Sequence, residues 1–133
     1  MTNFDEYRDV FVVADTIDDV VHPVTYELIG QARRIAKELG QLVQVMLLGE
    51  NVQAEAEELV AHGADIVHVF ESPLLKYYTT DGYTKVLTDF FEDHKPNILL
   101  IGATNNGRDL APRMSGRMQN GVVADCTILT VDT

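Results

Sequence analysis

Residues 98–113 read ILLIGATNNGRDLAPR, an apolar run followed by a turn rich in glycine and asparagine and then a polar helical pattern. The opening ILLI has the continuous apolar character of a strand that is buried on both faces, as in parallel sheets. A proline in a helix interior collides with the carbonyl group four residues earlier, so Pro112 limits how far upstream the helix can begin. We therefore predict a loop over residues 103–108, an N-cap at Asp109 and a helix near residues 109–119.

Apolar runs alternate with helical patterns through the rest of the chain as well. The predicted strands span residues 10–14, 42–48, 66–70, 98–101 and 122–129, and the predicted helices before the last one span residues 23–39, 52–62 and 82–94. Parallel strands need crossover connections, and these are right-handed in nearly all cases. The pattern predicts an α/β fold, an open and mostly parallel sheet with helices on both faces, Rossmann-like, with strand order 3-2-1-4-5.

Ligands of such sheets bind beyond the carboxyl ends of the strands, where the strand order reverses. For this order the reversal falls between the first and fourth strands, so residues 15–22 and 103–108 should face each other. The residues that could form a cradle for an anion or a nucleotide there are Thr104, Asn105, Asn106, Gly107 and Arg108. The alternative is an ordinary strand-to-helix turn in which Arg108 pairs with a nearby acid. The stretch contains neither GxGxxG nor GxxxxGK[ST], so neither classical phosphate loop is present.

The composition restricts the partners and the chemistry. The chain has 133 residues, and ten Lys and Arg against twenty-one Asp and Glu give a net charge of −11. This balance argues against a nucleic-acid partner and against an anionic membrane surface, because both are bound through Lys and Arg. The single cysteine excludes an internal disulfide, and the four histidines lack metal-ligand spacing, so we expect no metal site. We expect a cytoplasmic protein with no membrane insertion, since no apolar run is long enough to span a membrane and the N-terminus lacks a signal pattern.

Three other features of the sequence call for an interpretation. Asp15, Asp18 and Asp19 follow the first predicted strand and are best explained as a solvated turn. The adjacent Tyr77 and Tyr78 either mark a partner surface or belong to a loop that packs against the predicted helix at 82–94. Cys126, in the last extended run, is expected to be a small buried residue.

The string GATNNGRDLAPRMSGRM, preceded by KPNILL and followed by GVVADCTIL, resembles the electron transfer flavoprotein alpha subunit. The upstream segments HPVTYELIGQARRIAKELG, VMLLGE and HGADIVHVFESPLLKYYTTDGYTKVL resemble that family's first helix, second strand, and third strand with the following helix. The resemblance covers nearly all of the chain. It implies that residues 1–133 are an incomplete N-terminal α/β domain, of the adenine nucleotide alpha hydrolase-like type, without the C-terminal FAD-binding domain.

The resemblance also implies an electron carrier and not an enzyme. In that family an alpha and a beta subunit pass electrons through FAD from acyl-CoA dehydrogenases of fatty acid beta-oxidation, or from similar flavoenzymes, to an acceptor; electron-bifurcating members take them from NADH. The principal FAD site lies in the C-terminal domain, and the beta subunit holds AMP or a second FAD. The present segment would then be the scaffold that docks the beta subunit, with Thr104, Asn105, Asn106, Gly107 and Arg108 at a second nucleotide near the alpha–beta contact.

A second interpretation is a stand-alone adenine-nucleotide-binding domain of the universal stress protein type. That class generally has a GxxGxxxxGS-type phosphate loop after its fourth strand. The stretch GATNNGRDL lacks the second half of such a loop and its serine.

Overall fold

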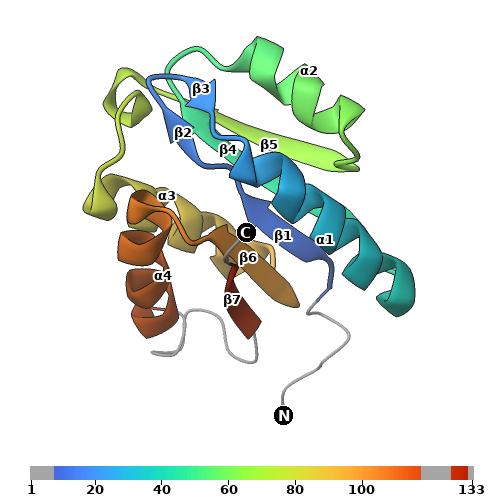
Figure 1. Ribbon diagram of the computed structural model, residues 1–133. Helices are drawn as coiled ribbons and strands as arrows, with labels where there is room; N and C mark the ends of the chain where they lie inside the picture. Colours follow the sequence, from blue (N-terminus) through green and yellow to red (C-terminus); the bar gives the residue numbers. More distant parts are fainter. Residues whose placement is uncertain (1–7, 118–126, 132–133) are drawn as a thin grey trace.

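The structure is a computed structural model that describes residues 8–117 and 127–131. Its centre is a five-stranded sheet in the order β5-β4-β1-β6-β7, in which every neighbouring pair is parallel (Figure 1). The strands are β1 (Val10–Val13), β4 (Val43–Gly49), β5 (Ile66–Glu71), β6 (Ile98–Gly102) and β7 (Thr127–Val131). Counted along the chain, this is the predicted order 3-2-1-4-5, so the predicted topology is confirmed.

In the part of the chain that the structure describes, four α-helices lie between these strands. They are α1 (Val24–Leu39), α2 (Gln53–Ala61), α3 (Thr80–Asp93) and α4 (Asn105–Arg117), and a 3₁₀ turn, η2 (Pro73–Leu75), lies between β5 and α3. Helix α1 ends where Gly40 adopts a left-handed conformation with φ of 66°. Glycine is favoured there because it has no β-carbon to clash with the preceding turn.

The helices divide the core into two layers, one on each face of the sheet (Figure 1). Alternate residues of β1 point to opposite faces. Val10 and Val12 pack with residues of α1, whereas Phe11 and Val13 pack with residues of α3 and α4. All four side chains are buried. This double burial explains why the strands appear in the sequence as continuous apolar runs.

The start of α4 differs from the prediction. The helix begins at Asn105, so the predicted loop over residues 103–108 and the predicted N-cap at Asp109 are wrong. Pro112 lies inside the helix on its exposed side. It removes one hydrogen bond to the carbonyl of Arg108, a loss that helices tolerate when their remaining contacts compensate for it. Part of the predicted last strand, including Cys126, lies outside the described residues.

A short antiparallel hairpin follows β1, formed by β2 (Thr16–Ile17) and β3 (Val20–Val21). Its two-residue turn consists of Asp18 and Asp19, whose φ angles are 51° and 63°. Positive φ at both positions is the geometry of a type I′ hairpin turn, which aspartate tolerates better than most residues. The predicted turn is therefore present, but it is a specific hairpin and not merely a solvated loop.

Within the described residues, no helix is both long and apolar enough to cross a membrane. The same part of the chain has no group of three or more histidine, cysteine or acidic side chains placed to hold a metal ion.

Candidate functional site

The two segments that should face each other do meet, at the carboxyl ends of β1 and β6. The hydroxyl group of Thr104 donates a hydrogen bond to the carboxylate of Asp15. The same oxygen accepts one from the backbone N–H of Gly107 at 3.1 Å, and the Thr104 carbonyl accepts from the N–H of Arg108 at 2.8 Å. Thr104 therefore caps α4, satisfying donors of the first turn that have no partner within the helix.

Glycine at position 107 allows α4 to approach β6 very closely. A β-carbon built on Gly107 would lie 1.7 Å from the carbonyl oxygen of Gly102. Gly107 is buried, whereas Asn105 and Arg108 beside it are exposed. Of the five residues of the predicted cradle, Thr104 and Gly107 fix the start of the helix. Asn105 and Arg108 face solvent, and Asn106 is half-buried.

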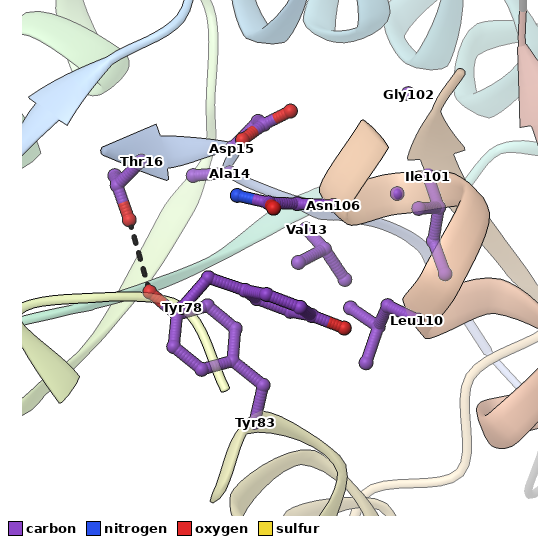
Figure 2. Close-up of a pocket in the computed structure, with 11 residues that line it drawn as sticks. Val13, Ala14, Asp15, Thr16, Tyr78, Tyr83, Ile101, Gly102, Asn106 and Leu110 are labelled. Carbon is purple, nitrogen blue, oxygen red and sulfur yellow. Dashed lines mark hydrogen bonds between the residues drawn. The ribbon is translucent and has the colours of Figure 1, made fainter. Parts of the chain in front are cut away.

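A small cavity lies beside this helix start, between α4, the end of β1 and α3 (Figure 2). Its polar lining comes from Asp15, Thr16, Tyr78, Tyr83 and Asn106. The cavity volume is about 20 Å³, which is room for about one water molecule. A nucleotide does not fit inside it.

The chain's own groups already satisfy the deepest polar atoms of this cavity. The Thr16 and Tyr83 hydroxyl groups lie 3.2 Å apart within hydrogen-bond reach (Figure 2). Thr16 donates to the carbonyl of Leu48 at 2.9 Å. Burial raises the pKa of Tyr83, so its phenol stays neutral and remains a donor. These atoms hold the wall of the cavity together and leave little hydrogen-bonding capacity for a ligand.

Tyr78 connects the segment after η2 to α4. Its hydroxyl group donates to the carboxylate of Asp109 at 2.7 Å, and its ring packs against Tyr83 with the centroids 4.9 Å apart. The hydroxyl of Thr80 donates to the same carboxylate. Burial, and then the hydrogen bond to Asp109, raise the pKa of Tyr78 to about 12. The hydrogen bonds from Thr80 and Tyr78 lower the pKa of Asp109.

These contacts settle the interpretation of the tyrosine pair. Tyr78 packs against Tyr83 of α3, which is the predicted packing of the loop on that helix, whereas Tyr77 is 61% exposed. Asp109, predicted to be an N-cap, instead lies within α4 and anchors the start of α3. The sequence spacing offered no signal for this role, because the two partners are about thirty residues away in the chain.

The charges at the start of α4 both oppose and favour the predicted anion cradle. A helix N-terminus carries a partial positive charge that attracts anions. Here the carboxylate of Asp15 lies at that terminus through its bond to Thr104. Arg108 has no ion-pair partner among the described residues, so the alternative in which it pairs with a nearby acid finds no support there. Within the described part of the chain, its exposed guanidinium therefore remains without a bound carboxylate.

Solved structures place this architecture in a known class. A universal stress protein in complex with cAMP matches with a TM-score of 0.56 and 14% identity, covering 95% of this chain and 98% of that one. The universal stress protein from Archaeoglobus fulgidus in complex with dAMP matches with a TM-score of 0.57 and 15% identity, covering 93% and 97%. At such low identity these likenesses show the fold alone. The fold is of the Rossmann-like, adenine nucleotide alpha hydrolase-like class, as predicted.

The sequence comparisons are more specific. The family model of the electron transfer flavoprotein domain matches residues 10–133 of the sequence, and the chain belongs to this family. The electron transfer flavoprotein subunit alpha of Megasphaera elsdenii is 46% identical over 127 residues, which cover 96% of this chain and 38% of that protein. Subunit LctC of an NAD(+),ferredoxin-dependent lactate dehydrogenase of Acetobacterium woodii is 47% identical, covering 92% and 29%. An acryloyl-CoA reductase electron transfer subunit beta of Anaerotignum propionicum is 43% identical, covering 98% and 35%.

These matches confirm the resemblance to the alpha subunit of an electron transfer flavoprotein. The chain spans less than two fifths of the length of these curated relatives. The location in the cell and the roles of Thr104, Asn105, Asn106, Gly107 and Arg108 toward a nucleotide stay predictions.

Proposed function

We propose that residues 1–133 form the scaffold domain of an electron transfer flavoprotein alpha subunit, which docks a beta subunit and leaves the binding of the principal FAD to residues beyond position 133. The proposal rests on the contrast between the extent of the family match and the small size of the cavity. The family match spans residues 10–133, yet the cavity at the reversal point of the sheet is only about 20 Å³. Sheets of this kind bind their ligands at the reversal point, and FAD does not fit the cavity there, so the principal FAD of a flavin carrier would lie elsewhere in the complete subunit.

The complete heterodimer would act as a carrier and not as an enzyme. It would accept electrons from an acyl-CoA dehydrogenase or a similar flavoenzyme, or from NADH if it bifurcates electrons, and pass them through FAD to an acceptor. The names of two relatives support an oxidoreductase as the partner, since one belongs to a lactate dehydrogenase and one to an acryloyl-CoA reductase. The chemistry of donor and acceptor would depend on the FAD site and the beta subunit.

The exposed side chains at the start of α4 would contact the AMP or second FAD of the beta subunit at the surface of this domain. Arg108 is exposed and has no ion-pair partner in the described part of the chain, so its planar cation suits a phosphate group. Asn105 is exposed beside it, and Asn106 lies half-buried at the cavity. Thr104 and Gly107 would contribute indirectly, by fixing the position from which these side chains project.

Labelling of the complete heterodimer with a photoreactive FAD analogue tests the scaffold role. We expect the principal label in alpha-subunit peptides beyond residue 133. A principal label within residues 1–133 would contradict the proposal. Colourless protein that binds ATP with no flavin would favour the interpretation as a stand-alone domain of the stress-protein type.

The variant Arg108→Ala tests the second-nucleotide contact in the same heterodimer. We expect weaker binding of AMP, or a shifted potential of the second flavin. The variant Arg34→Ala, which removes an exposed arginine on α1, is the matched control and should leave both quantities unchanged. If neither quantity responds to Arg108→Ala, the contact at Arg108 is excluded.

A further inference from the structure

The hairpin β2–β3 presents two apolar side chains to solvent. Ile17 and Val20 are cross-strand partners directly before and after the turn, and they are 59% and 67% exposed. The other pair of the hairpin, Thr16 and Val21, is buried. Isolated exposed apolar residues are common on protein surfaces. Two side by side on the outer face of one hairpin form a small apolar knob that the described part of the chain leaves uncovered.

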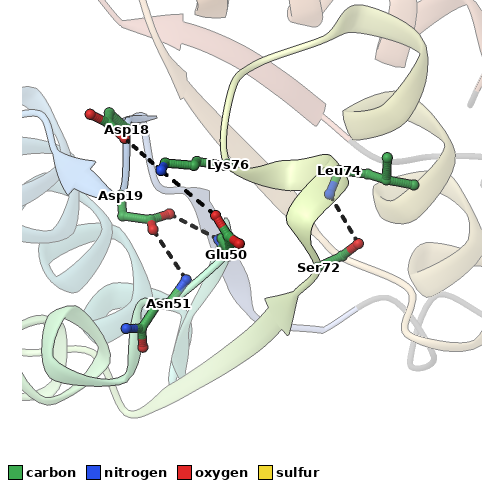
Figure 3. Close-up of polar contacts among 7 residues, drawn as sticks. All are labelled: Asp18, Asp19, Glu50, Asn51, Ser72, Leu74 and Lys76. Atoms are coloured by element: carbon green, nitrogen blue, oxygen red, sulfur yellow. Dashed lines mark hydrogen bonds and ion pairs between the residues drawn. The ribbon is translucent and has the colours of Figure 1, made fainter.

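This knob is held in a fixed position. The carboxylate of Asp19 accepts hydrogen bonds from the backbone N–H groups of Glu50 at 2.9 Å and Asn51 at 3.2 Å (Figure 3). At the base of the hairpin, the N–H of His22 donates to the carbonyl of Asp15 at 2.7 Å. The geometry is therefore set before any partner binds. Surfaces that are preorganised in this way lose less conformational entropy on association.

The rim of the knob is acidic. Asp18 lies at the hairpin tip, Asp19 beside it and Glu50 below them (Figure 3). Lys76 is the cation among them, with its Nζ 3.6 Å from Asp18 and 3.8 Å from Glu50. It also lies 5.7 Å from the ring centroid of the exposed Tyr77. Three carboxylates against one ammonium leave this rim negative, so its complement is an apolar depression bordered by Lys or Arg.

We propose that the hairpin patch, meaning Ile17 and Val20 with their acidic rim of Asp18, Asp19 and Glu50, is a docking surface for the beta subunit. The inference rests on the proposed function, which requires a stable contact between the two subunits. The apolar pair supplies area that is removed from water on binding, and the acidic rim selects a basic border on the partner. The anchored turn presents the pair without reorganisation. Tyr77, whose exposed ring has its centroid 5.7 Å from the Nζ of Lys76, extends the surface.

The test uses the complete alpha subunit and its beta subunit, with the dissociation constant of the heterodimer as the readout. The double variant Ile17→Thr, Val20→Thr keeps β-branched side chains in the hairpin but removes apolar surface. We expect it to weaken the complex about tenfold or more, as for residues at the centre of an interface. The control is Val60→Thr on α2, whose parent side chain is 52% exposed, and it should change the constant less than about twofold.

A second variant tests the charge of the rim without altering the core of the hairpin. Asparagine also tolerates positive φ, so Asp18→Asn keeps the turn and removes one charge. We expect slower association and a weaker dependence of the association rate on salt. If the double variant lowers the melting temperature of the free subunit, Asp18→Asn alone decides whether the patch docks the partner.

The outcomes separate the two proposals. An unchanged dissociation constant for the double variant overturns the proposal for the hairpin patch and leaves the proposed function intact. If the double variant is destabilised, an unchanged salt dependence of association for Asp18→Asn has the same consequence. A parent alpha subunit that forms no complex with the beta subunit contradicts the proposed function itself. Equal weakening by the double variant and by Val60→Thr also overturns the patch, because the effect would then not be specific to the hairpin.

Discussion

The main chain of Gly102 at the end of β6 and Gly107 in the first turn of α4 are in direct contact: a β-carbon on Gly107 would lie 1.7 Å from the Gly102 carbonyl oxygen. Real β-carbons do not approach a backbone oxygen so closely, and no flexible side chain is available to move away. The contact therefore fixes how near the helix start lies to the end of the strand. It also fixes the positions of the exposed Asn105 and Arg108, which lie in the same helical turn as Gly107.

The first prediction follows from this contact. Gly107→Ala should destabilise the fold by about 3 kcal/mol or more, because α4 must move away from β6 to relieve the clash. Gly116 lies in the same helix with nothing within 4 Å of the position of its β-carbon. There Gly116→Ala should stabilise the fold by up to about 1 kcal/mol, because alanine is the better helix former. Denaturant unfolding measures both, and equal stability of the two variants would contradict the contact.

A second prediction concerns the cap of α4. Thr104→Ala removes the oxygen that accepts the Gly107 N–H and the donor to Asp15. Loss of an N-cap side chain costs about 1 kcal/mol of stability. Thr104→Ser keeps the hydroxyl group and should retain most of that free energy. The cap is not the source of the effect if the serine variant unfolds at the same denaturant concentration as the alanine variant.

The strand order was predictable because burial on both faces produces continuous apolar runs, and five such runs separated by helical patterns leave few topologies. The start of α4 was not predictable from the same reasoning. Pro112 suggested a later start, but the contact of Gly107 with Gly102 and the cap by Thr104 favour an earlier one. Both are tertiary or side-chain interactions that outweigh the local cost of an interior proline.

The hairpin β2–β3 was missed for a related reason. Each strand has only two residues, too few for an alternating pattern to stand out. The signal that could have found it is the pair Asp18 and Asp19 between β-branched residues, since two adjacent residues that tolerate positive φ are typical of a two-residue hairpin turn. The anchoring of Asp19 to the backbone of Glu50 and Asn51 depends on residues 31 and 32 positions away and has no local signature.

A third prediction concerns Tyr78 and Asp109. Burial first, and the hydrogen bond to Asp109 second, raise the pKa of Tyr78 to about 12. Asp109→Asn removes the negative charge that opposes ionisation of the phenol, so the pKa of Tyr78 should fall, while burial keeps it above the ordinary value of about 10. Ultraviolet difference absorbance during an alkaline titration reports the phenolate. The control Asp89→Asn removes the exposed partner of Lys85 and should leave the titration unchanged, whereas a shift of similar size there would show a nonspecific effect of charge.

A final prediction concerns His68, which lies on the edge strand β5. Its Nε2 is 2.6 Å from the side-chain oxygen of Gln44, and its ring lies 4.7 Å from that of Phe90 and 6.0 Å from that of His94, measured between centroids. Burial, and then the nearby His94, lower the pKa of His68 from its ordinary value of 6.5. At pH values between the lowered pKa of the folded chain and the ordinary pKa of 6.5, the unfolded chain binds a proton at position 68 more readily than the folded chain does.

The sign of the pH dependence follows from this difference. Stability rises with pH wherever the unfolded state binds more protons, so the contribution of His68 is fully present above about pH 6.5 and is lost as the pH falls from there toward the lowered pKa. We expect the melting temperature to drop between about pH 7.5 and about pH 5.5, above the range in which most carboxylates titrate. His68→Gln cannot titrate and should flatten this drop, while His62→Gln controls for the removal of a histidine as such. A drop that is equally steep in His68→Gln and in the parent would show that burial of His68 does not set the pH dependence.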